Sequence, residues 1–238
     1  MAIRKDNRKA DELRKVSFTR NFTKYADGSV LVEFGDTKVI VTAIIENKVP
    51  KFLIDSGRGW LTAEYSLLPG SAQGRIIRDR GSLLSGRTQE IQRLIGRALR
   101  SAVDLTKIGE RTITIDADVI QADGGTRTAS ISGAYVALYY ALLKLQERGD
   151  IQQIPIIEPI AAISVGIVKG EVLLDLDYSE DSSADVDANI IMTESGKIIE
   201  FQSTSEKEPF SRDEMLKMLE FGEKGIREII DIQKNISG

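Results

Sequence analysis

The sequence contains neither cysteine nor histidine among its 238 residues. Without cysteine the chain can form no disulfide, no thiolate nucleophile and no cysteine-ligated metal site. Without histidine it lacks the usual general base near neutral pH and the commonest metal ligand. Any catalysis must therefore use carboxylates, Lys, Arg, Tyr, Ser or Thr side chains, a bound metal ion, or groups of the substrate itself.

Long hydrophobic runs and common nucleotide-binding motifs are also absent. No uninterrupted apolar stretch reaches the ~20 residues that cross a bilayer, and the charged start of the chain does not resemble a signal peptide. We therefore expect a cytoplasmic protein with no membrane partner. No Gly-x-x-x-x-Gly-Lys-Ser/Thr loop is present, and no Gly-x-Gly-x-x-Gly follows a predicted strand. These absences argue against ATP chemistry of the P-loop type and against a dinucleotide cofactor.

The composition indicates an ordinary globular protein. Hydrophobic residues make up 42% of the chain and charged residues 29%, and the length is sufficient to bury a substantial core. The net charge of −4 argues against a protein that is basic all over, although local patches decide whether a chain binds nucleic acid. We interpret residues 1–17, which are dense in charge, as a solvated arm basic enough to contact RNA. After this arm we predict one domain with two similar halves, over about 18–150 and 151–238.

Hydrophobic periodicity predicts an α+β fold in which the order hairpin, further strand, helix occurs twice. Because the strands come in hairpins and the helices separately, we expect mixed or antiparallel sheets with helices packed on one face. The predicted strands cover residues 28–34, 37–45, 60–66, 111–120, 161–168, 172–178, 189–193 and 198–203. The predicted helices cover residues 88–104, 129–145 and 212–233.

The centre of the chain predicts a strand, a tight turn and the start of a helix. Gly124-Gly125 follows the strand over 111–120 and permits backbone angles that other residues avoid. Thr126 is a good helix opener. A helix that begins at a glycine turn presents free N–H groups and partial positive charge, which attract anions. Arg127 adds a planar fork that suits phosphate. Taken alone, this pattern is more typical of a capped helix with a solvated arginine than of an anion-binding site. The segments on either side of it in the sequence favour the anion-binding site.

An arginine-rich segment precedes this unit. Residues 75–100 contain seven arginines, no lysine and only two acids. One interpretation is a solvated helix face next to a loop. The other is contact with phosphate, which arginine binds through two parallel hydrogen bonds, and the exclusive use of arginine favours it. The seven are Arg75, Arg78, Arg80, Arg87, Arg93, Arg97 and Arg100.

An acidic segment follows the central helix. Residues 171–187 hold seven carboxylates and no basic side chain. Most runs of this kind are exposed loops that aid solubility. Clustered carboxylates can instead hold a hard cation such as Mg²⁺, usually through one or two carboxylates and the phosphate oxygens of a substrate. The combination of this segment with the arginines and the glycine turn predicts metal-assisted chemistry at phosphate.

Three long motifs closely resemble those of bacterial ribonuclease PH. They are GRTQEIQRLIGRALR at 86–100, DADVIQADGGTRTAS at 116–130 and LDLDYSEDSSADVDAN at 174–189, and residues 31–39 and 59–66 match as well. The resemblance implies a pair of β-α-β units like ribosomal protein S5 domain 2, assembled as a hexameric ring that is a trimer of dimers. It implies a 3′→5′ exoribonuclease that uses inorganic phosphate as co-substrate, trims the 3′ ends of precursor tRNA and releases nucleoside diphosphates.

The same resemblance implies roles for individual residues. The attacking phosphate would be held by Arg87, Gly125, Thr126 and Arg127. Mg²⁺ or Mn²⁺ would be bound by Asp181 and Asp187, with Asp185 as a third ligand, and the first two with Arg127 would be the catalytic residues. Arg93 and Arg97 either shape the same pocket or belong only to a salt-bridge network. RNA would be contacted by Arg75, Arg78 and Arg80.

Two departures and two rival functions complete this interpretation. Members of the family often carry arginine where this chain has Gly70, and the loop over 70–86 is a residue shorter than is typical. We expect these departures to change the strength of tRNA binding and to leave the chemistry unaffected. The first rival is a non-catalytic subunit of an exosome-like ring that only binds RNA. The second is a metal-dependent nuclease that uses water.

Overall fold

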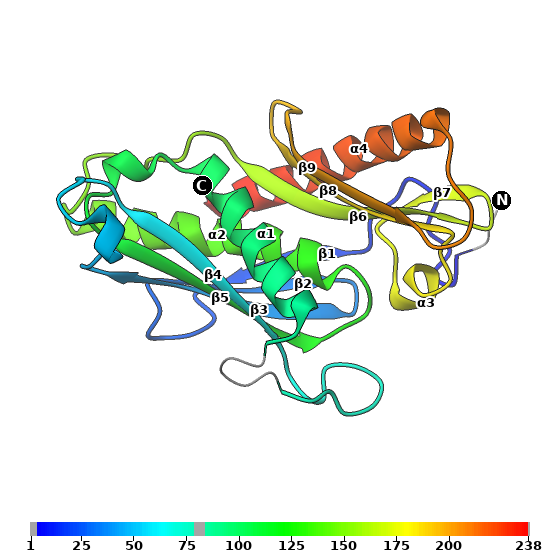
Figure 1. The fold of residues 1–238 in the computed structure, drawn as a ribbon, viewed down its shortest axis with the longest axis horizontal. Helices are drawn as coiled ribbons and strands as arrows, with labels where there is room; N and C mark the ends of the chain where they lie inside the picture. Colours follow the sequence, from blue (N-terminus) through cyan, green and yellow to red (C-terminus); the bar gives the residue numbers. More distant parts are fainter. Residues whose placement is uncertain (1–3, 79–83, 238) are drawn as a thin grey trace.

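The structure, a computed structural model, describes residues 4–78 and 84–237 as two sheets with helices between and beside them (Figure 1). The first sheet has the order β1-β2-β3-β5-β4, and the second has the order β7-β6-β8-β9. The strands of the first sheet are β1 (Val16–Arg20), β2 (Gly28–Phe34), β3 (Thr37–Glu46), β4 (Trp60–Leu67) and β5 (Thr112–Gln121). Those of the second are β6 (Ile160–Val168), β7 (Glu171–Leu174), β8 (Val186–Thr193) and β9 (Ile198–Ser205).

The first sheet is mixed and the second is antiparallel. β1, β2, β3 and β5 pair antiparallel in that order, whereas β4 pairs parallel to β5. Two parallel neighbours need a crossover connection, and helix α1 (Gly86–Ala102) supplies it and packs on β4. The expected mixed and antiparallel sheets with attached helices, and hence the α+β fold class, are confirmed.

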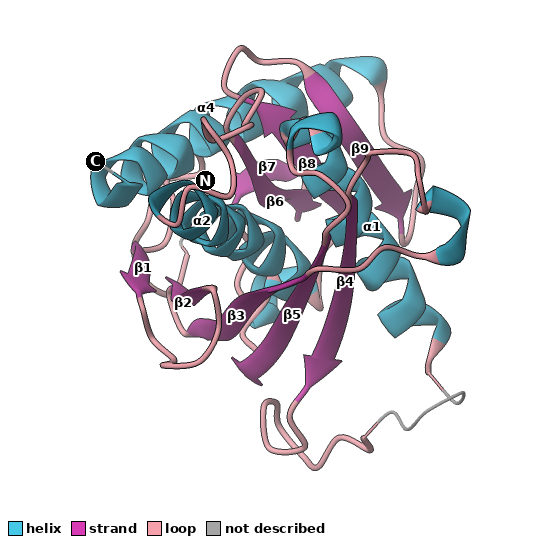
Figure 2. Cartoon of the chain, turned by 90° about the vertical axis from the view of Figure 1, so that its left-hand side faces the viewer, coloured by secondary structure: helices cyan, strands magenta, loops and turns pink. Residues whose placement is uncertain are grey.

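Helix α2 (Thr126–Glu147) is the centre of the molecule. It packs on β2 and β3 of the first sheet and on β6 of the second (Figure 2). One continuous hydrophobic core surrounds it. A helix buried on all sides must be apolar on all sides, which explains its run of Ala, Leu, Val and Tyr. Small residues allow the close approach: a Cβ added to Gly133 would lie 2.8 Å from Cγ1 of Val32 on β2.

Helix α4 (Arg212–Ser237) is amphipathic and covers β6, β7 and β8 along one side of the molecule (Figure 1). Two short 3₁₀ helices, η1 (Lys51–Leu53) and η2 (Leu105–Lys107), and the one-turn helix α3 (Tyr178–Asp181) complete the elements. None of the helices in the described ranges is long and apolar enough to cross a membrane. The division into one domain with two similar halves stays a prediction.

The prediction of a strand over 172–178 is wrong beyond Leu174. Asp175 takes a left-handed backbone conformation, with φ 54°, which ends the strand. Asp177 then caps α3, because its side chain accepts a hydrogen bond from the backbone N–H of Glu180 while the Glu180 side chain accepts one from the backbone of Asp177. Asp and Glu at this spacing form a capping box, so the acids of this stretch favour a helical turn over a longer strand.

Residues 4–17 do not form a solvated arm, which corrects the interpretation above for the part of the arm that the structure describes. Within 4–17, Arg4 and Arg14 are buried, and each forms an ion pair with a carboxylate of the acidic segment, Glu180 and Asp175 respectively. A buried carboxylate needs a hydrogen-bonded cationic partner, and the acidic segment has none of its own. The charges of Arg4 and Arg14 are therefore part of the folded body.

Candidate active site

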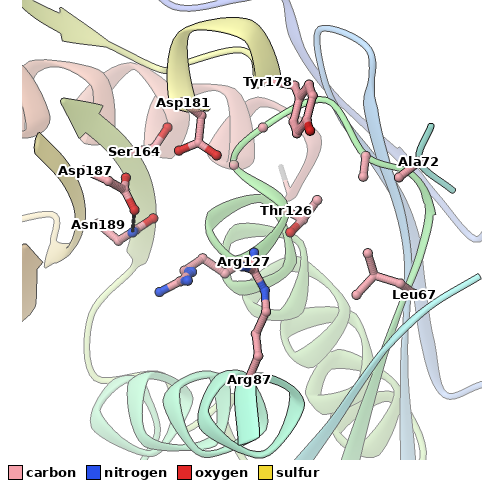
Figure 3. A pocket seen from close by; sticks show the side chains of 13 residues that line it. Leu67, Ala72, Arg87, Thr126, Arg127, Ser164, Tyr178, Asp181, Asp187 and Asn189 are labelled. Carbon is pink, nitrogen blue, oxygen red and sulfur yellow. Dashed lines mark hydrogen bonds between the residues drawn. The ribbon is translucent and has the colours of Figure 1, made fainter. Parts of the chain in front are cut away.

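A cavity of about 250 Å³ lies where the two sheets approach each other (Figure 3). It is bounded by the ends of β4 and α1, by the turn before α2, and by α3, β6 and β8. It brings together the turn, two arginines and two carboxylates that were predicted to act in one site. The lining residues are Leu67, Ala72, Arg87, Ala122, Gly124, Gly125, Thr126, Arg127, Ser164, Tyr178, Asp181, Asp187 and Asn189.

The glycine turn (Gly124-Gly125) has left-handed backbone angles, with φ of 76° and 66°. No side chain caps helix α2 at Gly125, so the N–H groups of its first turn remain available to an anion. Two hydrogen bonds fix the turn from outside the helix: Thr37 Oγ1 donates to Gly124 O at 2.6 Å, and Asp123 N donates to Thr37 Oγ1 at 2.9 Å. The turn is therefore a rigid structure with unused donors.

Two arginines face the same cavity from different elements. Arg127 comes from the first turn of α2, and its side chain is only 15% exposed. Its Nη1 donates to Gln202 Oε1 at 2.8 Å and lies 3.6 Å from Glu90 Oε1. Gln202 in turn donates to Glu90 Oε1 at 2.9 Å. Arg87, at the start of α1, extends towards Arg127 (Figure 3). Two guanidinium groups directed at one small space favour an anion between them.

Two carboxylates lie across the cavity from these arginines (Figure 3). Asp181 ends α3, and Asp187 lies on β8 opposite Gly166 of β6. Burial raises the pKa of Asp187, the negative charge of Asp181 raises it further, and the arginines of the cavity act in the opposite direction. Burial is also the main cause of the raised pKa of Asp181. Both groups are thus carboxylates for which ionisation is costly and a cation would be favourable.

The described residues contain no group of three or more Asp and Glu side chains placed to hold a metal ion. Mg²⁺ usually needs only one or two carboxylates, because water and substrate phosphate complete its shell. The Asp181 and Asp187 pair fits that requirement. The Asp187 carboxylate accepts one long hydrogen bond, from Asn189 Nδ2 at 3.4 Å, so both carboxylates keep oxygens free for a cation.

Asp185 is not brought into this site, which corrects its assignment as a third metal ligand. Its Oδ1 accepts a hydrogen bond from Lys207 Nζ at 2.6 Å, and it lines a different hollow, beside Val186 and Phe210. The hydrogen bond from Lys207 holds the pKa of Asp185 below its ordinary value. A carboxylate already paired with an ammonium group has little attraction left for a second cation.

Four of the remaining predicted arginines, which the structure describes, do not line the cavity. Arg93 and Arg97 are exposed on α1 and do not line it. Arg97 Nη1 lies 2.7 Å from Glu200 Oε2 of β9, so the salt-bridge interpretation describes Arg97. Arg75 and Arg78 are exposed in the segment after β4, and their contact with RNA stays a prediction. Arg80 lies outside the described residues.

Several residues that line the cavity or support it were missed. Asn189 was within reach, because it lies two positions from Asp187 on one strand and thus on the same face. Ser164 and Tyr178 had no such signal, since tertiary packing alone brings β6 and α3 to the glycine turn. The same holds for Tyr65, whose hydroxyl lies 2.9 Å from Oγ1 of Thr126. Gln202, which holds Arg127, was also missed.

Comparison with known proteins identifies the family of this chain. Residues 12–144 match the model of the 3′ exoribonuclease family, domain 1, and residues 158–225 match that of domain 2. The chain therefore belongs to the 3′ exoribonuclease family, also called the RNase PH family.

Solved structures with the same fold include exosome proteins. Rice (Oryza sativa) Rrp46 is 21% identical with a TM-score of 0.80, over 99% of this chain and 100% of that chain. A chain of the Archaeoglobus fulgidus exosome with RNA bound to the active site is 23% identical with a TM-score of 0.78, over 96% and 91%. A chain of an archaeal exosome core is 23% identical with a TM-score of 0.76, over 96% and 90%.

Proposed function

We propose that this member of the 3′ exoribonuclease family is a phosphate-dependent enzyme of the ribonuclease PH kind. It would remove nucleotides from the 3′ end of precursor tRNA and other RNA and release them as nucleoside diphosphates. One observation carries the proposal: a single cavity holds an anion-binding glycine turn and two arginines opposite a pair of carboxylates with raised pKa.

The cationic side of the cavity would bind and orient inorganic phosphate. Arg87 and Arg127 supply planar donors that match phosphate oxygens, and the glycine turn adds backbone N–H groups. An oxygen of this phosphate attacks the phosphorus of the terminal nucleotide while the bond from that phosphorus to the preceding O3′ breaks. The departing O3′ oxygen takes a proton carried by hydrogen phosphate. The nucleophile is already an anion, so a chain without histidine needs no strong base.

The acidic side would hold a divalent cation. Asp181 and Asp187 would bind Mg²⁺ or Mn²⁺, which when bound neutralises charge on the scissile phosphate and on the leaving oxygen. Asn189 orients Asp187 through the hydrogen bond at 3.4 Å. Gln202 and Glu90 hold Arg127 in place from the other side. Preorganised charges of this kind lower the barrier because they need no rearrangement during the reaction.

The RNA strand would reach the cavity past Tyr178 and past the exposed arginines after β4, Arg75 and Arg78. Tyr178 is the one aromatic side chain among the described lining residues and is 53% exposed. An exposed ring at the mouth of such a cavity offers a stacking surface for a base. Arg75 and Arg78 would hold the RNA backbone by charge. The proposal includes a hexameric ring in the cytoplasm, which light scattering and cell fractionation test.

The product of the reaction tests the proposal. Labelled RNA is incubated with the protein and Mg²⁺, with and without inorganic phosphate, and the released nucleotide is identified. We expect nucleoside diphosphate that appears only with phosphate. Monophosphate in both incubations would indicate a hydrolytic nuclease instead. Intact RNA, retained by the protein in a binding assay, would indicate the non-catalytic ring subunit, whose fold this chain equally shares.

A further inference from the structure

The N-terminal segment (residues 4–15) contacts both sides of the candidate active site from behind. Arg14 is the first contact. Its Nε and Nη2 donate to the two carboxylate oxygens of Asp175 at 3.0 and 2.7 Å, and the two side chains are 5% and 0% exposed. The same guanidinium reaches the glycine turn: Nη1 donates to Asp123 O at 2.5 Å, and Nη2 donates to Gly124 O at 3.4 Å.

These two carbonyls determine where the N–H groups of the turn point. In a trans peptide the C=O and the N–H of one unit point in opposite directions. The carbonyls of Asp123 and Gly124 belong to the same peptide units as the N–H groups of Gly124 and Gly125. Arg14 binds both carbonyls from behind, and Thr37 Oγ1 also donates to Gly124 O, so both N–H groups are directed away from these donors. Neither N–H donates to a partner within the described residues, and both glycines line the cavity.

Arg4 makes the second contact, with the helix that carries Asp181. Its Nε and Nη2 donate to the carboxylate oxygens of Glu180 at 2.8 and 2.7 Å. It also donates to Leu174 O and Asp175 O, both at 2.9 Å, and its side chain is 1% exposed. Glu180 closes the capping box of α3 and directly precedes Asp181. Arg4 thus fixes the short helix that presents one carboxylate of the site.

We propose that Arg14 and Arg4 are positioning residues for the two sides of the site. Arg14 directs the N–H groups of the glycine turn towards the bound phosphate, and Arg4 sets the position of Asp181 for the cation. This inference rests on the proposed function. The two sides also pack directly against each other: a Cβ added to Gly124 would lie 2.5 Å from Leu176 O.

Lysine variants test the inference without leaving an unpaired buried carboxylate. Lysine keeps the charge for the partner acid but lacks the fork that binds carboxylate and carbonyls together. For Arg14→Lys we expect inorganic phosphate to bind about 10- to 100-fold more weakly, the usual effect of losing an outer-shell partner, with an unchanged Mg²⁺ requirement. For Arg4→Lys we expect unchanged phosphate binding and a requirement for a higher Mg²⁺ concentration. Lys15→Ala and Lys5→Ala remove exposed charges from the adjacent positions as controls.

Phosphate binding is measured by calorimetry on the full chain without RNA, and the KM for phosphate and the Mg²⁺ dependence are measured in the trimming assay. A purely structural role would lower the melting temperature and kcat of both variants, with the KM for phosphate unchanged in Arg14→Lys and the Mg²⁺ dependence unchanged in Arg4→Lys, and that result overturns the inference. If Arg14→Lys does not fold, Asp175→Asn frees Arg14 from its partner and must weaken phosphate binding. If the unaltered protein binds no phosphate, the proposed function fails as well, whereas equal binding by Arg14→Lys removes only the positioning role.

Discussion

Replacement of Arg127 by alanine separates catalysis from folding most sharply. The side chain is directed into the cavity, yet it lies at the first turn of α2 and not in the hydrophobic core. The alanine variant would keep the glycine turn and the helix, because alanine is a good helix former. It would remove the charge that binds the attacking phosphate. We therefore expect a protein that is folded and binds RNA but scarcely uses phosphate.

The two expected magnitudes differ widely. Loss of one preorganised donor from an anion site lowers kcat by about 10²- to 10³-fold, or about 2.7–4 kcal/mol. The folded state would lose one hydrogen bond, to Gln202, which contributes about 1 kcal/mol, and a partly exposed ion pair with Glu90, which adds little. For a chain of this size about 1 kcal/mol lowers the melting temperature by about 2–4 °C.

The assay is trimming of a labelled RNA over a range of phosphate concentrations, with thermal unfolding of the same samples. Arg97→Ala is the matched control. It removes an exposed arginine that does not line the cavity. The partner of this arginine, Glu200, lies on β9, the strand that also carries Gln202. A surface change of this kind alters stability by at most about 0.5 kcal/mol, and we expect it to leave phosphate use unchanged.

The reasoning is refuted if Arg127→Ala releases diphosphate at the rate of the unaltered protein when phosphate is limiting. It is also refuted if Arg97→Ala loses activity to the same extent, because the cavity would then not be the place where phosphate binds. A large fall in melting temperature would instead show that Arg127 acts in folding.

Four further predictions follow from the same geometry. Asp187→Asn should abolish trimming yet raise the free energy of unfolding at neutral pH by about 0.5–2 kcal/mol, measured by denaturant titration. Since the pKa of Asp187 and Asp181 is raised above the ordinary 3.8, the folded protein keeps protons that the unfolded chain has lost. These two groups therefore add stability as pH falls through their folded pKa, and activity falls over the same range because a cation needs them ionised. Tyr178→Ala should raise the KM for RNA by the equivalent of about 1–3 kcal/mol of stacking, whereas Tyr178→Phe should not, and an unchanged alanine variant would exclude stacking. Backbone strain alone costs about 1–3 kcal/mol, and Gly124→Ala should destabilise the fold by more than this, because its Cβ would meet Leu176 O. Gly149→Ala is the control, because Gly149 has φ 77° and nothing lies within 4 Å of its added Cβ. It therefore measures the strain without the contact.

The central unit was predictable because its signals are local. The alternation over 111–120 and the glycine pair fix the end of β5 and the start of α2, and the structure has β5 at Thr112–Gln121 and α2 at Thr126–Glu147. The parallel pairing of β4 with β5 was not predictable in this way. Alternation shows which face of a strand is buried, but it carries no information about the direction of the neighbouring strand.

The N-terminal arginines show where sequence reasoning fails for a physical reason. A dense group of charges at a chain end is usually solvated, and nothing within residues 1–17 indicates otherwise. The partners of Arg4 and Arg14 lie at Glu180 and Asp175, more than 150 positions away in the chain. Only the folded arrangement brings them together, so the burial of these charges was beyond any pattern in the sequence.

Asp185 and Asp187 make the same point at short range. Both were assigned to the metal from the family resemblance, while the strand predicted from the sequence began only at residue 189. Asp185 precedes the start of β8 and binds Lys207, whereas Asp187 faces the cavity beside Asn189. Spacing gives the side of a strand but not its ends, and here the boundary of the strand separates an ion pair from a candidate ligand.

The acidic segment therefore divides according to whether a carboxylate has a cationic partner in the protein. Asp175 and Glu180 are neutralised by buried arginines, and such pairs leave no charge for a ligand. Within the part of the chain that the structure describes, Asp181 and Asp187 have no ion pair of their own, only the longer-range field of the cavity arginines and, for Asp181, of Arg14. If all four were unpaired, their mutual repulsion would oppose the compact fold. The N-terminal arginines neutralise part of the segment, whereas the charges of Asp181 and Asp187 face the cavity, where a cation and a phosphate can use them.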